Sequence, residues 1–448
     1  MTTPKVLILN QPFNTDTGGG ITLSNLFTGW DSRKLAVACS GYLLQDNIDT
    51  SICSTYYQLG EKEHKWVFPF NLLKRKYPSG LVTFDEKPIQ NLTQPVSKLR
   101  VQLITKVFYP FLQYLGLFHA ASSYELSKDF CAWLDEFNPD VIYAQCSDRG
   151  SIAFCIAVQA YLQKNMVFHM MDDWPTIISG EGLFKHYWQR KIDREFRILL
   201  ESCTVFLSIS DYMSEEYQQR YGKTFTAFHN PIDADFWKQY QRADYALNTP
   251  PTLLYAGRTG LGIQNSLKTI AKTIQALNEE LQLSIKFVLQ TAEIPDWTAA
   301  YSCVQHRKFV PYKELPRVFS EADLLILPYD FSTIATQYIK YSMPTKASEY
   351  MISGTPIVLF APKDTAAVKY AEDYGWAAVV TENKVEDLSR AIKQLILDES
   401  ARKNLAQNAQ KIAVMRHDVN RVSREFKETI CSAMEVKLHT TEHFARRT

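Results

Sequence analysis

The stretch that sets the fold is KVLILNQPFNTDTGGG, residues 5–20. Its first part, Lys5–Asn10, is a continuous apolar run of the kind that forms a strand buried on both faces of a parallel sheet. Three glycines at 18–20 follow a short polar loop, and apolar residues then recur at helical spacing over Ile21–Trp30. Glycines let backbone N–H groups approach an anion, and a helix start adds partial positive charge. This order predicts an α/β fold with an anion-binding loop, although the same glycines would also suit a plain turn.

The rest of the first half continues the alternation of strands and helices. Short apolar runs separated by helical stretches are typical of a parallel sheet with crossover helices. Residues 41–123 are less regular and are interpreted as an elaboration on this first domain, which we place at residues 1–240. The expected strands are Asp140–Ala144, Asn165–Met170 and Val205–Ile209, and the expected helices are Tyr124–Phe137, Ser151–Gln163 and Tyr187–Cys203.

The pattern restarts after a polar break. Two prolines, Pro250 and Pro251, precede a fresh strand, and a second set of strands and helices follows. We therefore predict a second doubly wound domain over residues 250–415, with residues 416–448 as a C-terminal helical segment. The expected strands are Thr252–Tyr255, Ser284–Gln290, Leu324–Leu327 and Pro356–Phe360, and the expected helices are Ser266–Leu281, Thr345–Ile352, Asp398–Val414 and Asn420–Val436.

Composition narrows the class of protein. The 448 residues are 46% apolar and 22% charged, with a net charge of +1, which is ordinary for a globular protein and gives no field that favours nucleic acid. Eight cysteines lack any C-x-x-C pair, which argues against a zinc site or a disulfide framework and favours reduced thiols in a cytoplasm. The longest apolar candidate for a membrane span, Val101–Ala121, contains Lys106, Pro110 and His119, so a spanning helix is not expected.

Polar residues follow one of the expected strands. His169, Asp172 and Asp173 lie where the strand Asn165–Met170 ends. Ligands of open α/β sheets bind at the carboxyl ends of the strands, so these side chains are candidates for sugar or acceptor contacts. A core histidine beside a capped helix start is the competing interpretation, and a metal site built from these three groups is disfavoured because no further ligand is evident.

Two stretches of the second half suggest phosphate binding. Gly257-Arg258 ends the first strand of the second domain, where a guanidinium can grip phosphate in a planar fork. The sequence YSMPTKASEYMISGTP, residues 341–356, places Lys346 and Glu349 three apart on one face of a short helix. The helix start and Lys346 could hold a phosphate, and Glu349 could accept two hydroxyls of a ribose. A surface salt bridge between Lys346 and Glu349 is the simpler alternative, but it does not explain why Pro344, Gly354 and Pro356 flank this helix.

These residues resemble the retaining nucleotide-sugar glycosyltransferases of family 4 (group 1). The resemblance implies the GT-B fold, in which two Rossmann-like domains face each other across a cleft and the C-terminal helix crosses back to the first domain. It also implies a nucleotide-diphosphate-sugar donor, a saccharide or lipid-linked acceptor, retention of configuration and a role in polysaccharide or glycoconjugate synthesis. No resident cofactor and no metal are expected. The implied roles are donor phosphate or acceptor contact for Gly19 and Gly20, pyrophosphate binding for Gly257 and Arg258, ribose binding for Glu349, charge compensation for Lys346, sugar contact for His169 and base contact for Val310.

The chain departs from the family pattern at two positions. Gln264 stands where the family usually has a lysine, and Tyr341 stands where many members have the first of two glutamates. Both are expected to lie in the donor site. These departures leave two other functions open, a nucleotide-sugar epimerase of the same fold and a catalytically silent nucleotide-sugar-binding partner.

Peripheral membrane contact is a further hypothesis. Leu73–Lys76 carries three basic residues, and basic residues lie among aromatic ones in Lys98–Phe118, a composition suited to an anionic membrane surface. Such contact would suit a lipid-linked acceptor on the inner face of a plasma membrane. A buried helix pair is the competing interpretation.

Overall fold

The computed structural model describes residues 3–15, 17–44, 48–68, 71, 76–84, 106, 109–177, 182–260 and 262–436. The chain forms two compact units. The first comprises Met1–Ser208, Ser214–Phe228 and Ser423–Thr448, and the second comprises Ile209–Met213 and His229–Val422. The greater part of the C-terminal helix, from Ser423, therefore belongs to the first unit.

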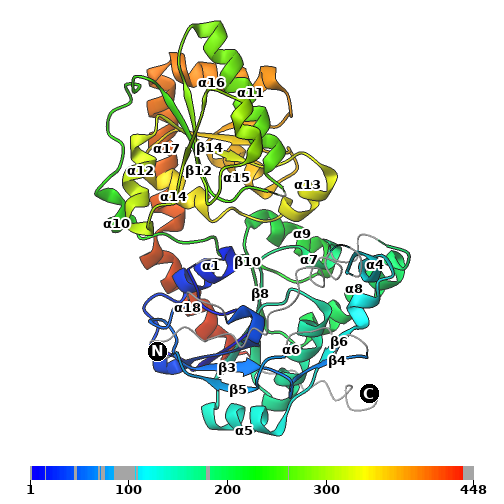
Figure 1. Ribbon diagram of the computed structural model, residues 1–448. Helices are drawn as coiled ribbons and strands as arrows, with labels where there is room; N and C mark the ends of the chain where they lie inside the picture. The colour runs from blue at the N-terminus through cyan, green and yellow to red at the C-terminus, as the bar shows by residue number, and fades with distance from the viewer. Residues whose placement is uncertain are drawn as a thin grey trace. The chain divides into compact units, whose positions relative to one another are not determined.

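The first unit is built on an eight-stranded sheet in the order β10-β9-β8-β7-β1-β2-β3-β5 (Figure 1). All neighbouring strands are parallel except β3 and β5, which are antiparallel. Two further strands, β4 (His64–Trp66) and β6 (Ser122–Tyr124), form a small antiparallel pair. The sheet strands are β1 Val6–Leu9, β2 Leu35–Ser40, β3 Tyr56–Leu59, β5 Gly80–Val82, β7 Val141–Ala144, β8 Asn165–Met170, β9 Val205–Ser208 and β10 Thr226–Ala227.

The irregular region 41–123 is more than an elaboration, because β3 and β5 within it extend the main sheet. Strand β2 was likewise not predicted from the sequence, although its residues are all buried. The α-helices of this unit, with the greater parts of α9 and α18, are α1 Gly18–Leu26, α4 Tyr109–Tyr114, α5 Lys128–Phe137, α6 Arg149–Leu162, α7 Trp174–Ile177, α8 Lys185–Glu201, α9 Asp211–Tyr221 and α18 Val419–Ala433.

Aromatic side chains fasten the C-terminal helix α18 to the core of the first unit. The Phe426 ring lies 5.1 Å from that of Phe27 on the segment after α1, and 6.0 Å from that of Tyr143 on β7. Ser423 Oγ also donates a hydrogen bond to the Asn25 carbonyl at 3.0 Å. Edge-to-face ring pairs add stability beyond the area they bury. The greater part of α18 is thus a structural part of the unit that also contains β1 and α1.

The second unit contains a six-stranded, wholly parallel sheet in the order β13-β12-β11-β14-β15-β16. The strands are β11 Thr252–Ala256, β12 Lys286–Gln290, β13 Val304–Arg307, β14 Leu324–Pro328, β15 Ile357–Phe360 and β16 Ala378–Val380. The α-helices are α10 Ala234–Lys238, α11 Gln264–Leu281, α12 Leu315–Glu321, α13 Thr333–Ile339, α14 Lys346–Ser353, α15 Ala366–Tyr374, α16 Val385–Leu397 and α17 Glu399–His417.

Helices cover both faces of this sheet, which confirms the doubly wound prediction. Leu253 and Tyr255 of β11 belong to one core cluster with α11 and α16. Leu254 and Ala256 of the same strand belong to another cluster, with α12, α14, α15 and α17. Successive residues of a strand point to opposite faces, so one apolar run supplies both cores. The helices cover the faces of the sheet and not the carboxyl ends of its strands, so polar residues can lie there, as at Gly257 directly after β11.

Candidate functional site

The strongest cluster of predicted residues lies where β11 ends, beside the start of α14. The Lys346 ammonium sits directly over Gly257, so that a Cβ added to this glycine would lie 1.8 Å from Nζ. The same Nζ lies 5.4 Å from the centroid of the Tyr255 ring. The Tyr255 hydroxyl in turn donates a hydrogen bond to the Arg258 carbonyl at 2.6 Å. Glycine is thus needed at 257 for the lysine to reach the strand end, and the structure brings Gly257, Arg258 and Lys346 together.

Burial and charge set the protonation of this cluster. Burial lowers the pKa of Lys346 to about 8; Glu349 opposes this shift and Arg258 adds to it. Burial raises the pKa of Glu349 to about 7, and Lys346 opposes that shift. Among the described residues, the side chains of Arg258, Lys346 and Glu349 have no hydrogen-bond or ion-pair partner. Two cations of this kind beside a helix start form a favourable place for an anion.

The position of α14 depends on a residue that sequence reasoning did not single out. The Tyr350 hydroxyl accepts a hydrogen bond at 3.1 Å from the backbone N–H of Ala256, the last residue of β11. Tyr350 is fully buried. This bond joins the helix that carries Lys346 and Glu349 to the strand that ends at Gly257. An aromatic residue directly after Glu349 was the only signal in the sequence.

The first turn of α11 carries Gln264, at the position where the resemblance drawn from the sequence implies a lysine. The N–H groups of that turn are already bonded, because the buried Asp330 carboxylate accepts from Ser266 N at 2.8 Å and from Asn265 N at 3.4 Å. Asp330 follows β14 and was not predicted to take part. Gln264 lines a cavity of about 390 Å³ together with Lys268 and the segment 293–297. The α11 start is therefore less available to an anion than the α14 start.

The remaining donor-site candidates lie in different surroundings. Val310 is half-buried in the loop after β13, between the exposed Phe309 and Pro311. Tyr341 is buried, its ring packs 5.3 Å from that of Tyr212, and its carbonyl accepts from Ser210 Oγ at 2.6 Å. The structure thus gives Tyr341 a packing contact in the second unit.

The glycine loop in the first unit is shaped by its own neighbours. Thr17 caps α1 by accepting from Gly20 N at 3.1 Å, and Asn14 Oδ1 accepts from Thr17 N at 2.9 Å. A Cβ at Gly20 would lie 2.3 Å from the Asn14 side chain, and one at Gly19 would lie 3.2 Å from Gln11 Oε1. Gly20 is buried and is required by this packing, whereas Gly19 lies closer to the surface.

His169 is enclosed in the core of the first unit. Its side chain is 1% exposed, and Nδ1 lies 2.6 Å from the Tyr143 hydroxyl, which also accepts from Gln145 Nε2 at 3.0 Å. Burial lowers the pKa of His169 to about 3, opposed by a backbone hydrogen bond to Ser208, so the ring is neutral. The surroundings match those of a core histidine, and a sugar contact stays a prediction.

Asp172 is exposed just after the end of β8, whereas Asp173 is buried. The Asp173 carboxylate is 4% exposed and accepts from Tyr217 at 2.6 Å and from Arg220 Nη1 at 2.8 Å. Removing one partner of a buried ion pair is strongly destabilising. Asp173 therefore serves the packing of α9 against β8, and of the two carboxylates Asp172 is the better candidate for a ligand contact.

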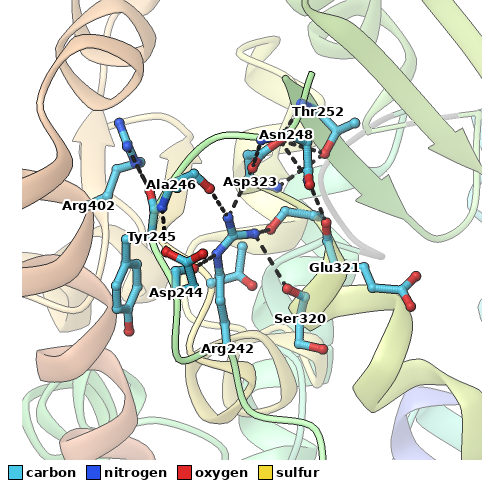
Figure 2. A network of polar contacts seen from close by, with 12 residues as sticks. Arg242, Asp244, Tyr245, Ala246, Asn248, Thr252, Ser320, Glu321, Asp323 and Arg402 are labelled. Carbon is cyan, nitrogen blue, oxygen red and sulfur yellow. Dashed lines mark hydrogen bonds and ion pairs between the residues drawn. The ribbon is translucent and has the colours of Figure 1, made fainter. Parts of the chain in front are cut away.

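The cavity of about 690 Å³ in the second unit lies at the opposite end of β11 from Gly257. Figure 2 shows the polar network there, centred on Asp323, which is 0% exposed. Its carboxylate accepts from Arg242 Nη2 at 3.0 Å, from Asn248 N at 3.0 Å and from Thr252 N at 2.7 Å. Every donor in this network is already used by the protein, so the network holds the segment before β11 in place.

The described residues also bear on metal binding and on membrane crossing. No three His, Cys, Asp or Glu side chains in the described ranges gather closely enough to hold a metal ion. Within the same ranges, no helix has the length and apolar character that crossing a membrane requires.

One comparison with known proteins concerns the second unit. Residues 238–412 match the family described as glycosyl transferases group 1. No curated protein matches the chain by sequence. Among solved structures, HepE of Anabaena, determined with UDP and glucose, superposes with a TM-score of 0.58 at 14% identity, covering 96% of this chain and 100% of its own.

Two other structures show the same architecture. The sucrose-phosphate synthase of Thermosynechococcus elongatus has a TM-score of 0.59 at 11% identity, with 96% of this chain and 99% of its own covered. A glycosyltransferase of Rickettsia africae has a TM-score of 0.60 at 10% identity, with 98% and 100% covered. Likeness at such low identity establishes the fold, and the family match over residues 238–412 spans Arg258, Lys346 and Glu349. The chain thus has the GT-B fold of two Rossmann-like domains, and its residues 238–412 are similar to the glycosyl transferases group 1.

Proposed function

We propose that this protein transfers a glycosyl group from a nucleotide-diphosphate sugar to a hydroxyl of a saccharide or lipid-linked acceptor, with retention of configuration. The observation that carries the proposal is the placement of Lys346 Nζ over Gly257, beside Arg258 and at the start of α14. Neither cation makes a hydrogen bond or an ion pair with a described residue, and the one carboxylate that acts on Lys346 electrostatically is Glu349 of the same helix. A donor diphosphate would supply a direct anionic partner.

The reaction needs stabilisation of the leaving group above all. As the bond between the anomeric carbon and the diphosphate oxygen breaks, negative charge grows on that oxygen. Arg258, Lys346 and the first N–H groups of α14 are fixed before the reaction and would meet this charge without reorganising. Glu349, one turn into the helix, would accept hydrogen bonds from the ribose hydroxyls. The acceptor hydroxyl would approach the anomeric carbon from the face that the diphosphate leaves.

The identity of the nucleotide is the first point to test. HepE was determined with UDP, which makes UDP the first candidate nucleotide here. Calorimetric titration with UDP, GDP and ADP under the same conditions would rank the three bases. Tight binding of one of them supports a donor site, and a folded protein that binds none of them contradicts the proposal.

Turnover tests the role of the cations. We expect Arg258→Ala to lower kcat/KM about 10- to 150-fold, which corresponds to the loss of about 1.5–3 kcal/mol for a charge-assisted contact. Arg390→Ala is the matched control, because Arg390 lies on the exposed side of α16 and pairs with Asp387 at 3.1 Å. Normal turnover in a folded Arg258→Ala variant would remove Arg258 from the mechanism.

Product analysis separates transfer from other chemistry. Incubation with donor alone should give slow hydrolysis at most, whereas donor and acceptor together should give a glycoside. Proton NMR of that glycoside reports the anomeric configuration, and an inverted product would contradict retention. Conversion of the donor into an isomeric nucleotide sugar without acceptor would instead indicate an epimerase.

A further inference from the structure

Two distant segments of the first unit meet at an exposed aromatic surface. Leu183 N donates a hydrogen bond to the Tyr114 carbonyl at 2.7 Å, which joins the end of α4 to the segment before α8 (Figure 1). Beneath this junction Trp188 packs so tightly against Gly116 that an added Cβ would lie 2.4 Å from its Nε1. A backbone hydrogen bond and close side-chain packing therefore hold the two segments together at this junction.

Large apolar side chains remain exposed on this junction. Trp188, Ile192 and Phe196 form the buried face of α8, so the exposed aromatics lie on a different face of the helix. Monomeric proteins rarely leave contiguous large apolar side chains in water without a binding role. We call this set, together with the cations described next, the aromatic–basic surface. Its exposed apolar members are Phe111 (57%), Tyr114 (58%), Leu117 (44%), Leu183 (61%), Phe184 (50%) and Tyr187 (56%).

The charges on α8 are strongly one-sided. Its first ten residues carry the four cations Lys185, Arg190, Lys191 and Arg194 against the single carboxylate Asp193. Asp193 is already paired with Arg197 at 2.9 Å. The next carboxylate, Glu195, is paired with Arg149 at 2.6 Å. The Lys191 ammonium lies over the Tyr187 ring at 5.9 Å, so cations and aromatics share one surface.

We propose that the aromatic–basic surface docks the protein on an anionic lipid bilayer. Aromatic rings settle at the headgroup level of a membrane, and lysine and arginine beside them meet lipid phosphates. The excess of four cations over one paired carboxylate is complementary to that surface and unsuited to a neutral one. This surface shares Phe111, Tyr114 and Leu117 with the segment Lys98–Phe118 named from the sequence, and it adds α8 and the residues just before that helix. Residues 73–75, 98–105, 107 and 108 lie outside the described residues.

The inference does not depend on the donor site. Docking requires no turnover, so it can hold even if the proposed glycosyl transfer fails, and donor binding can hold without docking. If both hold, the docking places the enzyme where a lipid-linked acceptor is found.

Vesicle sedimentation tests the docking. The full chain is mixed with vesicles of phosphatidylcholine alone and with vesicles that also contain phosphatidylglycerol, at low and at high salt. We expect sedimentation only with the anionic vesicles and less of it at high salt, because salt screens the lipid charge. Absence of sedimentation with anionic vesicles at low salt overturns the proposal.

Two double variants assign the binding to this surface. Lys185→Gln with Lys191→Gln should weaken vesicle binding about 25-fold, at about fivefold for each cation removed near an anionic membrane. Phe184→Ser with Tyr187→Ser should also weaken vesicle binding, although these two substitutions leave the net charge of the protein unchanged. Arg390→Gln with Lys403→Gln removes two cations from the second unit as the matched control. UDP affinity and circular dichroism should be unchanged in all three, since none of these residues lies at the donor site.

Two outcomes would overturn the proposal even if vesicles are bound, and a third would do so if they are not. Equal loss in the control variant would indicate a nonspecific charge effect. Unchanged binding in both double variants would place the contact elsewhere. Self-association that Phe184→Ser with Tyr187→Ser abolishes, without any vesicle binding, would make this surface an interface between copies of the chain.

Discussion

Replacing Gly257 by alanine tests the donor site without removing any charged group. The added Cβ would lie 1.8 Å from Lys346 Nζ and 2.8 Å from the Tyr255 hydroxyl, whereas ordinary contacts begin at 3.4 Å. The ammonium is the far end of a flexible chain and can move away, while the tyrosine ring is buried and resists. We therefore expect a folded protein that is destabilised by about 1–3 kcal/mol, the usual cost of overpacking.

The displaced ammonium should weaken donor binding by a predictable amount. Clearing the Cβ moves the charge by roughly 2 Å. At an effective dielectric constant of about 20, moving a unit charge from about 4 to about 6 Å from a phosphate charge costs about 1.4 kcal/mol, which is about tenfold in Kd. Isothermal titration of UDP into wild type and Gly257→Ala measures this change directly.

A double-mutant cycle shows whether Gly257→Ala acts through Lys346. If it does, Gly257→Ala in a Lys346→Met background should cause little further loss, because the displaced charge is already gone. Two additive losses would show that the alanine acts on something else. Unchanged UDP affinity in Gly257→Ala, together with weak binding in Lys346→Met, would refute the steric reasoning.

Three further predictions concern stability and pH. Asp323→Asn should destabilise the second unit by about 3–5 kcal/mol in urea unfolding, since it breaks a buried ion pair, whereas Asp244→Asn on the exposed rim of the same network should change little. UDP affinity should fall as pH rises through about 8, the pKa of Lys346, because the bound diphosphate needs the charged ammonium; Lys346→Gln should remove this dependence. His169 has a pKa near 3 in the folded protein and 6.5 in the unfolded chain, so it contributes stability above pH 6.5 that is lost as pH falls toward 3, by up to about 1.4 kcal/mol per pH unit. In thermal unfolding, His169→Gln should therefore lose less stability at acid pH than wild type does. An identical loss in the two proteins would contradict this.

The architecture was largely predictable because its signals are local. Continuous apolar runs such as Val6–Leu9 can only form strands buried on both faces, and helices must then cover both faces. The expected helix Thr345–Ile352 and the observed α14, Lys346–Ser353, differ by one residue at each end. The same locality explains why β3 and β5 were missed, since they join the sheet through pairing with distant segments.

The sequence by itself determined two doubly wound units and predicted Arg258, Lys346 and Glu349 as donor-site residues, because periodicity and short motif spacing are properties of neighbouring residues. Only the tertiary structure decided how these groups are arranged. It placed Lys346 over Gly257, fixed α14 to β11 through Tyr350, and capped α11 with Asp330.

Tertiary structure also reassigned several candidates to packing. Tyr341 packs with Tyr212, and Asp173 pairs with Arg220, a residue 47 positions away. It assembled the aromatic–basic surface from residues near Tyr114 and Leu183. Contacts between residues so far apart depend on how whole elements pack, and no local pattern of the sequence encodes that packing.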